Sequence, residues 1–338
     1  MNTNINKLNI FHYVDNFSKH DHIESKFIFM ADNYESADIT IIVPTYKRVD
    51  TLKETLNSIL SQKGDINYTI IVLDNNPERD DETELLMKKF SYSKISYVKN
   101  NENLGMAGNW NRGFMLAKSQ WVCLLHDDDV IVSSFLEEMF PYLNDFTDAA
   151  IIQSRKYKTK SPNIKPENTF NNDVIRYYAL DFHYYHIIDV PSGIFYKKDI
   201  VIKEGGFNPD FYPSLDYVFH MKLAYKYKVY VVNKYLTWYR IGEQNASKLF
   251  ETQRGWLIVD FYAIYQLLKK YCIPQLVILP YLELRTEERN NQVSRLWNTS
   301  TEIPYDHLIW KGYSTITKNI SKKIILIITI FNRRILRR

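Results

Sequence analysis

Three adjacent aspartates, Asp127, Asp128 and Asp129, follow an apolar run that ends at Leu125. Neighbouring carboxylates repel one another, so this arrangement is costly unless a cation neutralises it. Mg²⁺ and Mn²⁺ take oxygen ligands, commonly one or two carboxylates together with the phosphates of a substrate. The alternative is an acidic loop before the helix that begins near Ser133, because the helix dipole favours negative charge there. The triplet therefore indicates either a divalent metal site or a helix entry.

Polar residues also follow two earlier apolar runs. Thr45 and Tyr46 come after the run at residues 39–43, and Asp74 ends the run at residues 68–73. Continuous apolar runs are typical of parallel strands buried on both faces, and ligands bind at the carboxyl ends of such strands. We therefore expect all three polar clusters at one edge of a sheet. Asp74 can accept from a base or ribose there, or can form an Asx turn.

The elements that must position these clusters alternate along the chain. Strands are expected at residues 39–43, 68–73, 95–98, 121–125, 149–153 and 229–232. Helices are expected after residue 50, at 82–90, after 105, after 133, at 215–227 and at 253–271. Between residues 157 and 189 the chain loses clear periodicity. This order predicts an α/β fold with a mostly parallel central sheet, flanking helices and a C-terminal helical extension.

Composition excludes several other classes of protein. Hydrophobic residues make up 45% of the chain and charged residues 24%, which excludes a disordered or fibrous chain. The two cysteines, Cys123 and Cys272, provide neither a disulfide framework nor a zinc spacing. No secretory signal opens the sequence and no apolar run is long enough to span a bilayer, so we expect a cytoplasmic protein. No dinucleotide fingerprint or P-loop follows any expected strand.

Charge is distributed unevenly along the chain. Residues 317–338 contain seven basic and no acidic side chains, which leaves a net charge of −3 on the rest of a chain whose total is +4. An apolar stretch at residues 324–331 lies between the basic clusters. This tail predicts contact with an anionic membrane surface, or else a helix packed on the body with solvated Lys and Arg. The acidic body lacks a basic stripe, so we expect no nucleic-acid partner.

Four ordered motifs resemble those of family 2 glycosyltransferases, which have the GT-A fold. They are residues 41–48 (IIVPTYKR), residues 72–76 (VLDNN), Asn103-Leu104-Gly105 with Asn109 and residues 111–113, and residues 124–129 (LLHDDD). The resemblance implies that Asp128 and Asp129 bind the metal. It also implies a set of residues that bind the nucleotide sugar, with Asp74 on the base: Pro44, Thr45, Tyr46, Arg48, Asp74, Asn103, Gly105, Asn109, Asp127 and Arg240. His126 departs from the pattern, because many relatives carry an acid there.

Later residues resemble the acceptor half of these enzymes, namely Gly193, Gly205-Gly206-Phe207, Asp216 and Tyr239-Arg240. The implied general base is Asp216, although relatives usually show an acidic pair where this chain has Leu215-Asp216. A helix N-cap is the alternative for Asp216. His220, one helical turn further on, is a second candidate base or an ordinary helix histidine. Arg240 can hold diphosphate oxygens or form a surface ion pair.

The resemblance also implies a domain organisation. Residues 1–37 are expected to be a leader of uncertain structure and residues 38–250 a GT-A domain, with a nucleotide half at 38–130 and an acceptor half at 131–250. Residues 251–338 are expected to be a C-terminal helical region that ends in the basic apolar tail.

We therefore expect an inverting transferase that uses Mn²⁺ or Mg²⁺ to move a sugar from a UDP-sugar to a glycan hydroxyl or to a polyprenyl-diphosphate-linked acceptor. The resemblance suggests O-antigen or capsule synthesis at the inner face of the bacterial cell membrane. A sugar nucleotidyltransferase is the first alternative, but it should have a Gly-rich basic loop after the first strand, and residues 44–48 contain no glycine. An inactive, carbohydrate-binding relative is the second, supported only by the missing acids at His126 and Leu215.

Overall fold

The computed structural model describes residues 8–90, 93–159, 173–184, 186–188, 190–241, 249–297 and 302–336. Its strands are β1 (Ser25–Phe29), β2 (Ile39–Thr45), β3 (Tyr68–Asp74), β4 (Ile95–Asn100), β5 (Trp121–Leu124), β6 (Val130–Ile131), β7 (Ala149–Thr159), β8 (Val174–Tyr177), β9 (Ile194–Lys197) and β10 (Lys228–Arg240). Its α-helices are α1 (Val49–Leu60), α2 (Glu82–Lys89), α3 (Gly105–Leu116), α4 (Phe135–Asp145), α5 (Lys198–Lys203), α6 (Leu215–Lys226), α7 (Phe250–Lys270), α8 (Gln275–Trp297) and α9 (Thr315–Leu336). Short 3₁₀ turns are η2 (Ser18–His20), η3 (Ala179–His183), η4 (Pro209–Phe211) and η6 (Tyr305–His307).

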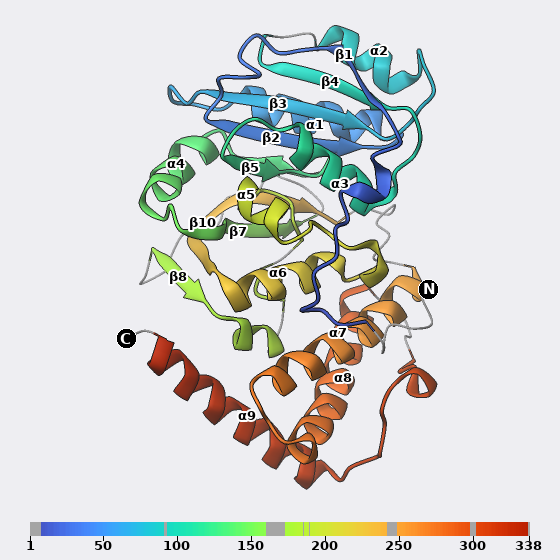
Figure 1. The fold of residues 1–338 in the computed structure, drawn as a ribbon, viewed down its shortest axis with the longest axis vertical. Coiled ribbons are helices and arrows are strands. Elements are labelled where there is room, and N and C mark those ends of the chain that lie inside the picture. The colour runs from blue at the N-terminus through green and yellow to red at the C-terminus, as the bar shows by residue number, and fades with distance from the viewer. Residues whose placement is uncertain are drawn as a thin grey trace.

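One sheet runs through the described part of the molecule in the order β1-β4-β3-β2-β5-β9-β7-β10-β6, with β8 also paired to β10 (Figure 1). Parallel pairing, which the continuous apolar runs predict, joins β4, β3, β2 and β5, and also β7 with β10. The other neighbours are antiparallel, because β9 runs back between β5 and β7 and β1, β6 and β8 are return strands at the edges. The sheet as a whole is therefore mixed.

The sheet buries both of its faces, as expected for strands with continuous apolar sequence. In β2, Ile41 and Val43 belong to a cluster with residues of α1, α2 and α4, whereas Ile42 belongs to a second cluster with residues of α3, α6, α7 and α8. Successive side chains of a strand point to opposite faces, so these clusters are the two layers of core on either side of the sheet. All seven residues of β2 and of β3 are buried.

Strand register brings the polar ends of the strands together. Thr45 is paired with Asp74, and Asp74 in turn with Lys99 at the end of β4. On the other side of β2, Ile42 is paired with Leu124, so the acidic triplet follows β5 beside the end of β2. The antiparallel pair of β6 and β10 then brings Arg240 close to the triplet.

The N-terminal segment, expected as a leader of uncertain structure, is part of this architecture from residue 8 onward. β1 extends the sheet by antiparallel pairing with β4. Ile10 is buried in the core, and its backbone N–H donates to Gln266 Oε1 in α7 at 2.9 Å. Residues 1–7 lie outside the described residues.

Helices α7, α8 and α9 form the part of the molecule opposite β1 and β4 in the view of Figure 1, where α8 lies beside both α7 and α9. The stretch at 157–189, which lacks clear periodicity, contains the end of β7, strand β8 and turn η3; residues 160–172, 185 and 189 lie outside the described residues. Among the helices that the structure describes, none has the length and apolar character that crossing a membrane requires.

Candidate active site

A cleft of about 730 Å³ lies where the parallel strands end, and helices α7 and α8 supply part of its wall. Ten of the residues that the sequence analysis singled out line this cleft: Pro44, Thr45, Tyr46, Arg48, Asn103, Gly105, Asn109, Asp127, Asp128 and Asp216. The cleft therefore joins residues expected to bind a donor with the residue expected to act as a base.

The acidic triplet forms a turn in which the N–H of Asp129 donates to the carbonyl of His126 at 3.3 Å. Thr45 Oγ1 donates to Asp127 Oδ2 at 2.8 Å. The Arg48 guanidinium lies 2.7 Å from Asp128 Oδ2 and 3.5 Å from Asp127 Oδ1. Because the backbone turns here, the three carboxylates do not alternate between the faces of a strand, and each has its own surroundings.

A possible cation site is formed by His126, Asp128 and Asp129, whose ligand atoms all lie within 4.8 Å of one another. Asp129 Oδ2 is buried, accepts no hydrogen bond from any described residue, and lies 3.9 Å from His126 Nδ1. Burial lowers the pKa of His126, which favours the neutral imidazole that can bind a metal. The two carboxylates suit Mn²⁺ or Mg²⁺, whereas the imidazole suits a transition metal and so favours Mn²⁺ of these two ions.

The pKa shifts of the aspartates in this turn also favour a bound cation. Burial, and next the charge of Asp128, raise the pKa of Asp129. Burial also raises the pKa of Asp127 to about 6, although Arg48 opposes this shift. The buried carboxylates thus resist ionisation together, and a bound cation would favour their charged forms.

Arg240 contacts the acidic turn through both its backbone and its side chain. Its backbone N–H donates to Asp129 Oδ1 at 2.8 Å, its Nε donates to the carbonyl of Asp128 at 2.9 Å, and its guanidinium pairs with Glu54. Arg240 is not among the residues that line the cleft, whereas its neighbours Tyr239 and Ile241 are. Its contacts therefore position the acidic turn.

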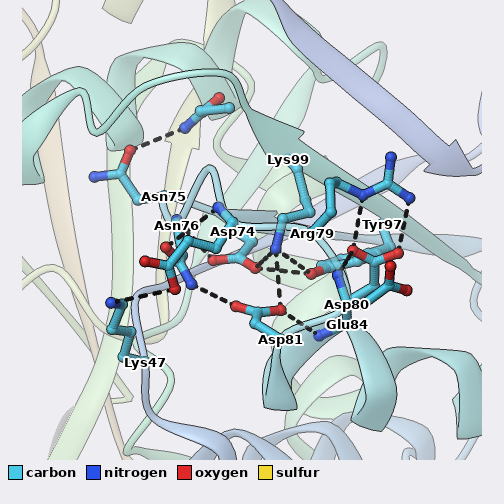
Figure 2. A network of polar contacts seen from close by, with 12 residues as sticks. Lys47, Asp74, Asn75, Asn76, Arg79, Asp80, Asp81, Glu84, Tyr97 and Lys99 are labelled. Carbon is cyan, nitrogen blue, oxygen red and sulfur yellow. Dashed lines mark hydrogen bonds and ion pairs between the residues drawn. The ribbon is translucent and has the colours of Figure 1, made fainter.

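Asp74, expected on the nucleotide base, is fully buried and does not line the cleft. As Figure 2 shows, its carboxylate is enclosed by donors: Asn76 N–H at 2.9 Å, Tyr97 Oη at 2.7 Å and Lys99 Nζ at 2.9 Å. The bond to Asn76 is the Asx turn that the sequence analysis left open as an alternative. Lys99 reaches Asp74 because β3 and β4 are paired in parallel register, and it also lies 3.1 Å from Asp81.

An amide network shapes the loop that leads into α3. Asn75 Nδ2 donates to Asn103 Oδ1 at 2.7 Å, and the N–H of Gly105 donates to the same oxygen at 2.8 Å. Gly105 has a φ of +68°, in the left-handed region that glycine adopts readily. Asn109 Nδ2 donates to the carbonyl of Leu73 at 3.2 Å, which ties α3 to the end of β3. These contacts fix the side of the cleft next to the β2 and β3 ends.

Comparison with known proteins identifies the family. Residues 40–205 match the family model described as glycosyl transferase family 2. This part of the chain belongs to glycosyltransferase family 2. An uncharacterised glycosyltransferase of Methanocaldococcus jannaschii is 26% identical over 216 residues, which cover 61% of this chain and 72% of the relative. The Escherichia coli protein WfaP, named as a UDP-Glc:α-D-GlcNAc-diphosphoundecaprenol β-1,3-glucosyltransferase, is 30% identical over 105 residues, 31% of this chain and 41% of its own.

The fold of the transferase is also that of a solved structure. Staphylococcus aureus TarS 1–349 in complex with UDP-GlcNAc superposes with a TM-score of 0.53 over 78% of this chain and 92% of that chain. Sequence identity is 14%, so this likeness concerns the fold alone. The transferase therefore has the GT-A fold that the four motifs imply.

The two candidate bases of the transferase lie in different environments. Asp216 lines the cleft at the start of α6 and is half-buried. His220 is fully buried in the core, where its Nε2 lies 2.7 Å from Tyr196 Oη and its ring packs against Tyr196 and Phe207. His220 lies one turn further along α6 and does not line the cleft.

Several residues that line the cleft were not singled out from the sequence. Trp110 stacks on His126 with ring centroids 5.4 Å apart, and His126 itself was noted only as a departure from the motif. Others come from distant segments, among them Lys158, His186, Trp256, Arg289, Gln292 and Val293. Each of these residues lies more than a hundred positions after β2 in the sequence. The local sequence around them does not indicate that they face the cleft.

Proposed function

We propose that this transferase moves a sugar from a UDP-sugar to a hydroxyl of a glycan or of a polyprenyl-diphosphate-linked acceptor, with inversion and with a divalent cation. The observation that carries the proposal is the shared cleft, which is lined by Asp127 and Asp128 of the acidic turn and by Asp216. The donor named for WfaP and the nucleotide sugar held by TarS support UDP as the carrier.

In this proposal His126, Asp128 and Asp129 would hold Mn²⁺ or Mg²⁺, and the ion would offset negative charge on the departing diphosphate. Arg48, at the rim of the same turn, supplies a further positive charge beside Asp128. Tyr46 is 45% exposed and offers a ring face to the base. We assign no base contact to Asp74, since its carboxylate is enclosed by Asn76, Tyr97 and Lys99.

Asp216 acts as the general base. Its carboxylate takes the proton of the acceptor hydroxyl while the oxygen of that hydroxyl forms a bond to the anomeric carbon of the donor sugar. The bond from that carbon to the diphosphate breaks, and UDP leaves with the electron pair. Attack on the face opposite the leaving group inverts the configuration. His220 takes no part, because it lies in the core.

We further propose that α9 rests on an anionic membrane. One stripe of this helix exposes apolar side chains at helical spacing: Ile316, Ile320, Ile324, Ile327, Phe331 and Ile335. Lys323 and Arg334 are exposed beside the stripe, and α9 has no acidic residue. A basic amphipathic helix of this kind binds at the surface of an anionic bilayer. Together with the acceptor named for WfaP, it supports a role in assembling a surface polysaccharide such as O-antigen or capsule.

Titration calorimetry of UDP with and without Mn²⁺ tests the donor site. We expect the wild type to bind UDP only when Mn²⁺ is present, and Asp128→Ala to lose this binding while remaining folded. The matched control is Asp210→Ala, because Asp210 is a half-buried acid of η4 that pairs with Lys19 at 3.8 Å and does not line the cleft. Binding that is equal with and without metal, or equal in Asp128→Ala, would contradict the proposed metal site. No binding of UDP at all would exclude this donor, and GDP and dTDP would then be titrated.

A further inference from the structure

Three basic side chains that sugar transfer as described does not use line the cleft. They are His186, which follows η3, Lys158, which lies in β7, and Arg289, which lies in α8. Each is at least partly accessible. Basic side chains that line a cleft suit an anionic ligand, here one other than the diphosphate of the donor.

A buried carboxylate organises two of these groups. Asp260 of α7 is 1% exposed, and its Oδ2 lies 3.0 Å from His186 Nε2 and 3.9 Å from Arg289 Nε. Ser214 Oγ donates to the other oxygen of Asp260 at 3.0 Å. The imidazole of His186 also stacks on Tyr217, with centroids 3.9 Å apart and an interplanar angle of 6°. His186 is thus fixed through its edge and its face.

Asp260 is ionised among basic groups. Burial alone would raise its pKa, but His186, Arg285 and Arg289 together hold it at about 2, so the carboxylate is anionic. Of these three groups, His186 and Arg289 also line the cleft. Asp260 therefore holds two basic side chains at the cleft surface.

The same contacts place this cluster next to the general base. Ser214, which holds Asp260, and Tyr217, which stacks on His186, flank Asp216 in sequence at the start of α6. An anion bound by His186 and Arg289 would therefore lie close to the acceptor hydroxyl from which Asp216 takes the proton. A phosphate on the anomeric carbon of the acceptor sugar meets this condition, because only the sugar ring separates it from the reacting hydroxyl.

We propose that Asp260, His186 and Arg289 form an acceptor-phosphate subsite, and that the acceptor is a sugar joined directly to a phosphate or diphosphate. This inference rests on the proposed transfer function and names its acceptor class. His186 and Arg289 contact the phosphate, and Asp260 positions both.

The test is calorimetric titration of undecyl diphosphate into the transferase with UDP and Mn²⁺ already bound, so that the donor site is occupied. We expect binding to the wild type and at least about tenfold weaker binding to Arg289→Gln, because a charge-assisted contact is lost. Arg289→Lys should keep most of the affinity. Arg254→Gln is the matched control, since Arg254 of α7 pairs with Asp306 at 3.6 Å and does not line the cleft. Undecyl glucoside, with the same chain and no charge, should bind all variants alike.

The other outcomes are distinct. Equal binding of undecyl diphosphate to the wild type and to Arg289→Gln, with UDP binding intact, overturns the subsite and leaves the proposed function standing. Pyrophosphate that binds as tightly as undecyl diphosphate overturns the assignment to an acceptor in favour of a free anion. A His186→Gln variant that loses kcat while its affinity for undecyl diphosphate is unchanged overturns it in favour of a second base. If UDP itself does not bind, the donor proposal fails, and the titration without UDP still decides the subsite.

Discussion

At the scale of single residues, the three aspartates of the acidic turn differ in partner although they are adjacent in sequence. Asp127 accepts from Thr45, Asp128 pairs with Arg48, and Asp129 accepts from the backbone of Arg240 while its other oxygen accepts no hydrogen bond from the described residues. Side-chain type alone gives the triplet one expected role. The surroundings separate it into a residue held at the end of β2, a residue at the cleft surface and a buried residue that faces His126.

Asp216→Asn should remove the general base without changing the donor site. We expect kcat to fall by about 10²- to 10⁴-fold, the usual contribution of a positioned base, whereas the affinity for UDP with Mn²⁺ stays within about twofold of the wild type. Transfer from a radiolabelled UDP-sugar and calorimetry with UDP measure the two quantities. A variant that keeps most of its kcat would show that another group takes the proton. His220→Asn tests the alternative, and we expect it to lower stability through the lost contact with Tyr196.

At the scale of elements, α9 packs one of its faces against the rest of the protein and exposes the other face to solvent. Lys318 pairs with Glu287 and Glu283 of α8, Ile325 is fully buried, and Thr329 Oγ1 lies 2.9 Å from His183 Nε2. The apolar stripe lies on the remaining face and extends along a helix of about 33 Å, at 1.5 Å per residue. Deleting the helix would therefore remove core contacts as well as the stripe, so exposed residues make the cleaner test.

The double variant Ile327→Gln, Phe331→Gln should weaken binding to anionic vesicles and leave the enzyme intact. These side chains are 66% and 64% exposed, and losing their insertion should reduce affinity by roughly 10- to 100-fold. Sedimentation with phosphatidylglycerol vesicles measures this, and phosphatidylcholine vesicles and added salt show the electrostatic part. Leu85→Gln on α2, 50% exposed, is the control. Unchanged sedimentation of the double variant would remove α9 as the membrane contact, while transfer to a soluble acceptor should be equal in all three proteins.

At the scale of the whole molecule, His183 joins the sheet-containing part to the C-terminal helices. It is 1% exposed, its Nδ1 lies 2.6 Å from Tyr281 Oη of α8, and its Nε2 contacts Thr329 of α9. Burial lowers its pKa to about 3. An unfolded chain returns the imidazole to an ordinary pKa near 6.5. Between these two values the unfolded state binds more protons than the folded state, so the free energy of unfolding falls as pH falls below about 6.5.

We expect His183 to reduce the free energy of unfolding by about 2 kcal/mol between neutral pH and about pH 5. Urea unfolding at both pH values measures the effect. His183→Asn should be less stable than the wild type at neutral pH and should lose this part of the pH dependence. His22→Asn, at an exposed position, should keep it. An equal pH dependence in the wild type and in His183→Asn would show that another group causes the acid sensitivity.

The local parts of the fold follow from sequence more directly than the distant parts. Continuous apolar runs predict β2, β3 and β5, and the polar residues after them predict an edge that binds ligands. Asp74, expected to contact the base, is enclosed in part by Lys99, and only the register of β3 and β4 brings Lys99 to it. Likewise Arg289 and His186 reach the cleft through the packing of α7 and α8, which no local pattern encodes. Contacts between segments that are distant in sequence therefore determine where these residues lie, and local sequence patterns do not reveal such contacts.

The hydrogen bonds between the segment that precedes β1 and helix α7 affect how the chain folds while it is being synthesised. Ile10 N–H donates to Gln266 Oε1, and Gln266 Nε2 donates to the carbonyl of Leu8, across 256 and 258 sequence positions respectively. Ribosomes add roughly 5–20 residues per second, so Ile10 waits roughly 10–50 s for its partner to be synthesised. During that time β2 to β5 can pair with one another, but the face of the sheet that α7 and α8 cover stays uncovered. The nascent chain is therefore most exposed to aggregation late in translation, shortly before the cleft acquires its second wall.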